Sequence, residues 1–298
     1  MLWLLLIVGS ATAFSVNYRK VFGSDWSAAE RYVSVHHQEW KETFDLFEVD
    51  ARMAEAVVFP ELIRYSMWQD EIERAAVNGL YVSKGREGAN FSIGRFQMKP
   101  SFAEEVEQAW NASSLAQQYG FSFNLADNNE ARRSRIRRLS TVEGRCRYLA
   151  IFIRLLQQRH PRLQQLPKQE QVRFLATAYN RSFSASWNDI RRLQHERHFH
   201  TDVIRTRSTR LYCYADIAAA AFASTQKGGK SGAYGYFLAK ESGFTAGKHY
   251  FCVYYCIIYD DYECKEVYGC PCAGRAVDGR CPCTGISEGS GAACRGPE

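Results

Sequence analysis

Alternation of apolar and polar residues, the pattern of a half-buried β-strand, is almost missing from the first 230 residues of this 298-residue chain. The body of the protein is therefore expected to be mainly α-helical. Hydrophobic residues make up 46% and charged residues 23%, an ordinary globular composition. The length suffices for one large domain or two modest ones with an ample core.

Cysteine is scarce over most of the chain, where only Cys146 and Cys213 occur. The remaining eight crowd the C-terminus and contain no C-x-x-C pair: Cys252, Cys256, Cys264, Cys270, Cys272, Cys281, Cys283 and Cys294. Three interpretations of this tail stay open. It is a disulfide-stapled module, a zinc site despite two awkwardly close C-P-C units, or a disordered or anomalous end, including one produced by a reading-frame error.

Positive charge is lacking before the apolar run at the N-terminus, yet the run otherwise resembles a secretory signal. Residues 2–8 are its apolar core, and Ala11-Thr12-Ala13 is a small-x-small cleavage site. The run is too short to span a bilayer, and no cysteine follows it for a lipid anchor. We expect a signal peptide over residues 1–13 and an exported protein, periplasmic or secreted, without a stable membrane span after cleavage. An uncleaved anchor is the alternative.

The net charge is +6 overall and +9 before Phe251. A basic surface outside the cytoplasm suggests an anionic polymer as partner: glycan strands of the cell wall, a membrane surface or nucleic acid. The densest run, "ARRSRIRR" (residues 131–138), lacks the interleaved aromatic residues of a single-strand-binding groove. We therefore expect no nucleic-acid partner, and a solvated helix face is the simpler interpretation of this run.

Helix signals recur along the body. Asp25 is placed to cap a helix whose apolar positions include Trp26, Tyr32, Val33, Trp40 and Phe44. Capping boxes are expected at residues 101–104 and 140–143. The expected organisation is a helical domain over residues 14–225, a Gly-rich connector over 226–250 and the Cys-rich tail over 251–298.

Glu61 is the acidic residue with the most apolar neighbours, Phe59, Pro60, Leu62 and Ile63. Desolvation raises the pKa of a carboxyl group, and a general acid needs a raised pKa at neutral pH. Pro60 distorts a helix and can aim the next side chain away from the packing face. If Pro60 instead begins a new helix, the positive helix end favours ionised Glu61. A surface or salt-bridged glutamate is the plain alternative.

Three short motifs follow one another along the chain, and their order is informative. Glu61 is followed by Gly94-Arg95-Phe96-Gln97-Met98-Lys99-Pro100 and then by Ala178-Tyr179-Asn180. In this order the chain resembles the superfamily of lytic transglycosylases and goose-type lysozymes, over roughly residues 50–183. The resemblance implies a lysozyme-like α-helical domain that acts on peptidoglycan glycan strands without a cofactor or metal; protein partners are not indicated.

The resemblance also implies roles for individual residues. Glu61 would protonate the glycosidic oxygen and then accept a proton from the 6-hydroxyl of the sugar. The remaining implied residues bind substrate. Ser92 would bond the N-acetyl group, Gly94 would let the backbone approach the sugar, and Gln97 and Met98 would line the subsite beside the cleaved bond. Tyr179 and Asn180 would orient the substrate and Glu61; the plain alternative for these two is a place in the helix core and at its C-terminal cap.

A single glutamate suffices when the substrate assists. Most glycosidases need two carboxylates, but the acetamido group of N-acetylmuramic acid can stabilise the cationic centre while its own 6-hydroxyl attacks. No second acid has a comparable claim, although Asp70, Glu71 or Glu73 would be needed if water were the nucleophile. The sequence departs from the family in a longer gap before Gly94.

The leading hypothesis is a lytic transglycosylase that cleaves the MurNAc-β-1,4-GlcNAc bond and leaves a 1,6-anhydro end. The alternatives are a hydrolytic muramidase on the same fold, a catalytically inactive glycan-binding protein, and a metal- or redox-linked protein defined by its tail. The histidines of "HERHFH" (residues 195–200) are expected in a basic surface segment, because a metal site would need helical geometry and a nearby acid or cysteine.

Overall fold

The computed structural model describes residues 16–65, 79–202 and 205–228. Helices account for 71% of the described residues, which confirms the mainly α-helical class. Every described residue belongs to the unit Met1–Gly232. The expected signal segment, the Cys-rich tail, most of the expected connector and the acids Asp70, Glu71 and Glu73 lie outside the described residues.

The named elements follow in chain order. They are α1 (Tyr18–Leu46), α2 (Ala51–Tyr65), η1 (Gly85–Glu87), α4 (Pro100–Asn111), α5 (Ser114–Tyr119), α6 (Asn129–Ser140), α7 (Val142–Arg159), η2 (Pro161–Gln165), α8 (Lys168–Arg181), α9 (Trp187–Leu193), β1 (Arg197–Phe199), β2 (Tyr212–Cys213) and α10 (Tyr214–Gly228). Residues 79–84, ahead of η1, are also helical. The two short strands pair antiparallel.

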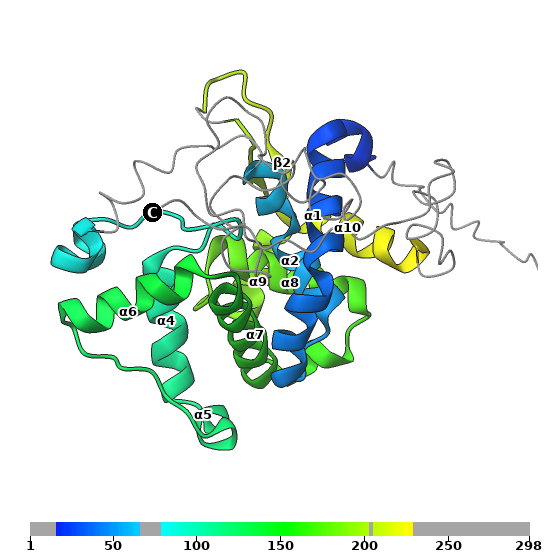
Figure 1. Cartoon of the computed structure of the whole chain (residues 1–298). Helices are drawn as coiled ribbons and strands as arrows, with labels where there is room; N and C mark the ends of the chain where they lie inside the picture. The colour runs from blue at the N-terminus through cyan, green and yellow to red at the C-terminus, as the bar shows by residue number, and fades with distance from the viewer. Residues whose placement is uncertain (1–15, 66–78, 203–204, 229–298) are drawn as a thin grey trace, which may run out of the picture. The chain divides into compact units, whose positions relative to one another are not determined.

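Helix α7 lies at the centre of the helical body (Figure 1). It packs against α1 on one side and against α4 and α6 on the other, while α2, α8 and α10 pack on one another and α1 packs on α2. The middle of α7 is apolar on every side: residues 148–153 are all buried. A helix that is hydrophobic all round belongs in the interior, so the composition of α7 accounts for its central position.

Helix α1 bends at Gly23, whose φ of 49° is accessible to glycine and costly for most other residues. Beyond the bend, the expected apolar face is buried at Trp26, Val33, Trp40 and Phe44. This spacing of seven, seven and four residues is that of a core-facing helix stripe, which confirms the expected apolar face. The expected cap at Asp25 is wrong, because Asp25 lies inside α1 and the N-cap is Asn17.

The basic run of α6 is more internal than expected. Arg135 donates through Nε and Nη2 to Oε2 of Glu107 at 2.9 and 2.6 Å, and Arg138 donates to Oε1 at 2.7 Å. Glu107, on α4, is completely buried. A buried carboxylate needs such charged partners. These two arginines therefore join α6 to α4, and the interpretation of the whole run as a solvated face is wrong.

Two thiols are buried without a disulfide partner among the described residues. Cys146, on α7, is completely inaccessible, and Cys213, on β2, is 3% exposed. Burial raises the pKa of both thiols.

None of the described helices combines the length and hydropathy that crossing a bilayer requires.

Candidate functional site: a cleft around Glu61

Glu61 lies inside α2, which continues through Pro60 to Tyr65. The proline therefore does not begin a new helix, and a positive helix end does not act on the carboxylate, because that effect is confined to the first turn. Glu61 is only 5% exposed. The expectation of a carboxyl group withdrawn from water is confirmed.

The segment after Ser92 forms a tight turn between Ile93 and Met98. The two residues exchange backbone hydrogen bonds, Ile93 N to Met98 O at 2.8 Å and Met98 N to Ile93 O at 3.3 Å. Inside the turn, Gly94 and Gln97 have positive φ angles of 65° and 52°. The Gln97 side chain donates from Nε2 to the Gly94 carbonyl at 3.0 Å, which ties the turn to itself.

Three helices hold this turn in place. The Phe96 ring meets Trp40 of α1 edge-on, with centroids 5.0 Å apart. The Phe96 carbonyl accepts a 2.6 Å hydrogen bond from the Tyr179 hydroxyl of α8. Arg145 of α7 lies against Gly94, where an added Cβ would fall 2.5 Å from Nη1. The Tyr179 hydroxyl thus serves to fasten the turn.

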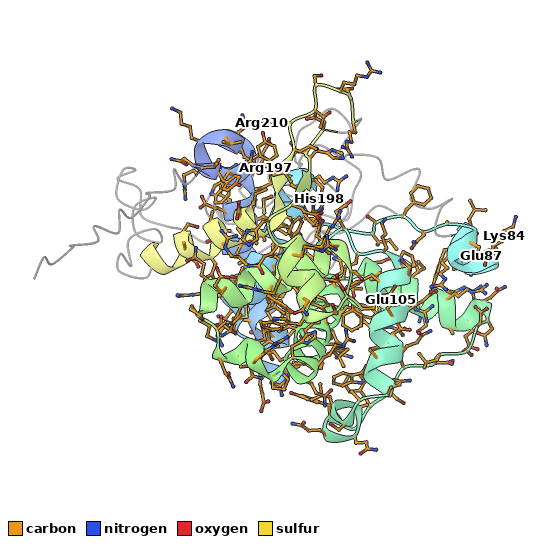
Figure 2. The ribbon with its side chains drawn as sticks, turned by 180° about the vertical axis from the view of Figure 1, so that it is seen from behind. Lys84, Glu87, Glu105, Arg197, His198 and Arg210 are labelled. Atoms are coloured by element: carbon orange, nitrogen blue, oxygen red, sulfur yellow. The ribbon has the colours of Figure 1, made fainter. Side chains whose placement is uncertain are left out.

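A cleft of about 400 Å³ runs beside Glu61. Six of the seven residues expected at the site line it: Glu61, Ser92, Gln97, Met98, Tyr179 and Asn180. Gly94 does not line the cleft; the absence of its side chain leaves room for Arg145 instead. Figure 2, seen from behind, labels two other lining residues that come from different elements, His198 on β1 and Glu105 on α4.

The two oxygens of Glu61 have different surroundings. Oε1 accepts a hydrogen bond from Nδ2 of Asn180 at 3.4 Å. Oε2 lies 3.9 Å from Nη1 of Arg64 and is buried without a hydrogen-bond partner in the described part of the chain. A buried polar atom without a partner is rare in folded proteins and often marks a site of chemistry.

Burial is the main cause that raises the pKa of Glu61 to about 7. Arg64, the Asn180 amide, the nearby Tyr214 hydroxyl and Lys99, in this order, act in the opposite direction and limit the rise. A group with a pKa near 7 is present in both protonation states at neutral pH, so it can donate a proton and later accept one.

His198 is the site residue that sequence reasoning missed. It lies on β1, half-buried, and its Nε2 bonds Oδ1 of Asn180. The expected surface segment is thus wrong for this histidine. The alternation around the buried Phe199 is a strand signal, but three residues are too few to identify it. Within the described ranges, no three His, Cys, Asp or Glu side chains gather as a metal site.

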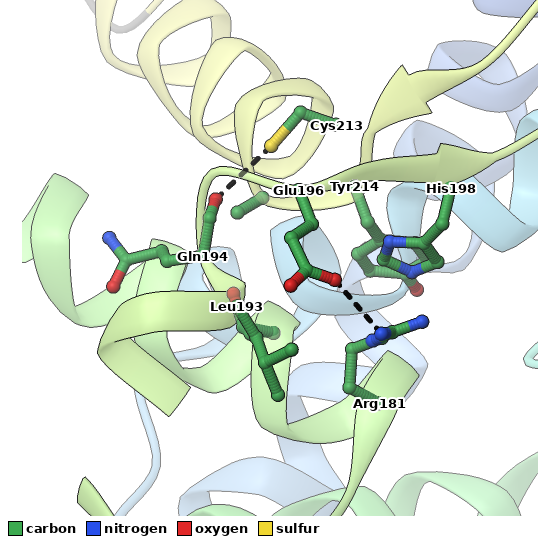
Figure 3. Close-up of a pocket in the computed structure, with 9 residues that line it drawn as sticks. Arg181, Leu193, Gln194, Glu196, His198, Cys213 and Tyr214 are labelled. Carbon is green, nitrogen blue, oxygen red and sulfur yellow. Dashed lines mark hydrogen bonds and ion pairs between the residues drawn. The ribbon is translucent and has the colours of Figure 1, made fainter. Parts of the chain in front are cut away.

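His198 also lines a second, narrow pocket that has no room for a water molecule (Figure 3). There Arg181 pairs with Glu196, Nη2 to Oε2 at 2.9 Å, and the Cys213 thiol donates to the Gln194 carbonyl at 3.2 Å. These contacts join α8 to the residue before β1, and β2 to the end of α9, on either side of the segment that leads to His198.

Comparison with known proteins adds no relative: no family model, no curated protein and no solved structure matches this chain.

Proposed function

We propose that the protein is a peptidoglycan lytic transglycosylase with a lysozyme-like domain, in which Glu61 is the single general acid and base. The observation that carries this proposal is the state of Glu61: it is buried, it has a pKa near 7, and it borders a cleft with the residues of the motifs resembling the family. The proposal requires export, because peptidoglycan lies outside the cytoplasm.

The reaction needs two proton transfers at Glu61, one to the substrate and one from it. Protonated Glu61 donates to the glycosidic oxygen as the bond from that oxygen to C1 of N-acetylmuramic acid breaks. The acetamido group supports the positive charge at C1, and the 6-hydroxyl oxygen then bonds C1. Glu61 accepts the proton that this hydroxyl loses, so the enzyme returns to its first state and the product is a 1,6-anhydro sugar.

The surroundings of Glu61 suit this exchange. The Asn180 amide stabilises the ionised form between the two proton transfers, and burial stabilises the protonated form before them. Gln97 and Ser92 offer polar groups along the same cleft. The turn that carries Gln97 is braced by Tyr179, so these groups are held in place before substrate arrives.

Digestion of purified peptidoglycan tests the proposal. The wild-type protein should release fragments with 1,6-anhydro ends, identified by mass spectrometry. Glu61→Gln should lower the rate by about a hundredfold or more, because it removes the proton donor. Glu143→Gln, the same change on an exposed carboxylate of α7, should keep the wild-type rate. Cleavage that survives in the Glu61→Gln protein would refute the assignment.

The position of Glu105 supports a second candidate function, that of a hydrolytic muramidase. It is a partly exposed acid of α4 on the same cleft as Glu61, and two carboxylates permit attack by water. Fragments with reducing ends, lost on Glu105→Gln, would establish this reaction in place of the first. A protein that never cleaves and binds the polymer equally well with and without Glu61 would be a glycan-binding protein.

A further inference from the structure

We propose that His198 is a positioning residue that sets the orientation of the Asn180 side-chain amide, so that the amide donates to Glu61. The inference rests on the proposed function, since it concerns the same carboxyl group. It adds a residue that none of the three sequence motifs contains and that is linked to Glu61 through the Asn180 side chain.

The direction of the hydrogen bonds carries the argument. Oδ1 of Asn180 can only accept, so the bond from His198 places a proton on Nε2. With Oδ1 engaged there, the NH₂ end of the amide faces Glu61, and Nδ2 donates to Oε1 at 3.4 Å. A chain of two hydrogen bonds thus runs from His198 on β1 through the Asn180 side chain to Glu61 on α2.

His198 is suited to a fixed donor role because its ring stays neutral at neutral pH. Burial lowers the pKa of His198, nearby Arg181 lowers it further, and Glu196 opposes this. The other ring nitrogen, Nδ1, is buried and makes no hydrogen bond of normal geometry among the described residues, although the Glu196 backbone lies near the ring and raises its pKa. The ring therefore offers one N–H, and it offers it to Asn180.

Several charged or titratable groups face Glu61 besides this chain of hydrogen bonds. Arg64 lies on its own helix, Tyr214 on α10, Lys99 ahead of α4, and Tyr179 on α8. All remain when His198 is replaced, so a change in the pKa of Glu61 can be traced to the amide. Without the donor at position 198, the amide is free to turn Oδ1 toward Glu61, which destabilises the carboxylate.

A matched pair of variants tests this. His198→Gln keeps a nitrogen donor near the position of Nε2, whereas His198→Met has a similar length and no donor. The pKa of Glu61 is measured by NMR titration of ¹³C-labelled glutamate carboxyl groups in the full chain. It should rise by about one unit in the Met variant and keep the wild-type value in the Gln variant. His195→Ala, three residues earlier and exposed, should also keep that value.

The kinetic counterpart is the pH profile of peptidoglycan cleavage. The alkaline limb of kcat/KM should move upward in the Met variant by the shift seen in the titration, with KM little changed. Equal titration curves for the Met and Gln variants would overturn the proposal. If the titration behaves as expected and no form of the protein cleaves glycan, the positioning role stands and the proposed function fails.

One measurement on the wild-type protein does not depend on how well any variant folds. The ¹⁵N chemical shifts of the imidazole ring report which nitrogen carries the proton. We expect the Nε2–H form of His198. A proton on Nδ1 with a bare Nε2 would reverse the bond to Asn180 and overturn the proposal.

Discussion

At the scale of the residue, the buried carboxyl group of Glu61 makes the stability of the fold depend on pH. Its folded-state pKa is about 7, whereas an unfolded chain ionises it near 4.5. The folded state therefore holds the proton more tightly than the unfolded state does, and this contribution to stability is complete below about pH 4.5. It is lost progressively as the pH rises to 7.

The change Glu61→Gln should make the protein more stable at alkaline pH. The amide carries no charge to desolvate, so relative to the wild type the free energy of unfolding should gain about 3 kcal/mol between pH 4.5 and pH 8. Urea unfolding across this pH range measures the gain. Glu55, also buried and with its pKa raised to about 7, keeps its own pH dependence in both proteins.

Glu143→Gln is the control for this prediction, because Glu143 is an exposed residue paired with Arg147 at 3.5 Å. Its stability should follow the wild type across the whole pH range. Parallel pH curves for the Glu61→Gln and wild-type proteins would mean that Glu61 titrates normally, and the case for a general acid would lose its physical basis.

At the scale of the element, the turn from Ile93 to Met98 depends on a glycine for two separate reasons. Gly94 has a positive φ, and it lies against the guanidinium of Arg145. Gly120, which ends α5, has a similar φ of 69° and nothing within 4 Å of the position of a Cβ. Substitutions at these two glycines therefore distinguish the cost of backbone strain, which both share, from the cost of crowding against Arg145, which only Gly94 has.

Gly94→Ala should destabilise the protein more than Gly120→Ala. An alanine at a positive φ costs about 1 kcal/mol at either position, and at residue 94 the displacement of Arg145 adds about 1–2 kcal/mol more. Denaturant unfolding of the two variants gives the difference. Equal losses would show that Arg145 moves aside without cost and does not brace the turn.

Helix starts illustrate what local patterns can and cannot predict. The apolar face of α1 follows from helical spacing, and it is buried. The capping box expected at Ser101 is wrong, because Pro100 takes the first position of α4 and Lys99 precedes it. In α7 the cap is Thr141, one residue after the expected Ser140, and Thr141 Oγ1 accepts from Gly144 N at 3.1 Å.

The candidate site was predictable to the extent that its residues belong to motifs. Glu61, Gln97 and Asn180 stand out in the sequence and line the same cleft. His198 does not, because its contact with Asn180 arises only when a three-residue strand pairs with β2 and is laid beside α8. No spacing along the chain reports such a contact.

At the scale of the whole molecule, positive charge and the cleft coincide. Arg64, Lys99 and Arg181 line the cleft, where Glu61 and Glu105 are the acids. Lys99 is exposed and forms no ion pair within the described ranges. With a net charge of +6, the protein should attract an anionic glycan from a distance, and salt should screen that attraction.

Binding of the Glu61→Gln protein to insoluble peptidoglycan should weaken several-fold as salt rises from about 0.02 M to about 0.3 M. Lys99→Gln in that background should weaken binding further. Lys41→Gln removes the same charge from an exposed pair with Asp45 on α1 and should have a smaller effect. Co-sedimentation measures the salt dependence and the effect of each lysine substitution. Equal effects of the two substitutions would show that the charge of the cleft does not contribute specifically to binding.

Cys146 is buried on the central helix α7, so chemical labelling of its thiol can be used to follow transient opening of the protein interior. Its sulfur is inaccessible, and burial keeps it in the unreactive thiol form. An alkylating reagent can reach it only when the central helix separates from its neighbours. At a fixed pH and reagent concentration, the rate at which the peptide containing Cys146 acquires a label therefore reports how often the interior opens, with no engineered probe.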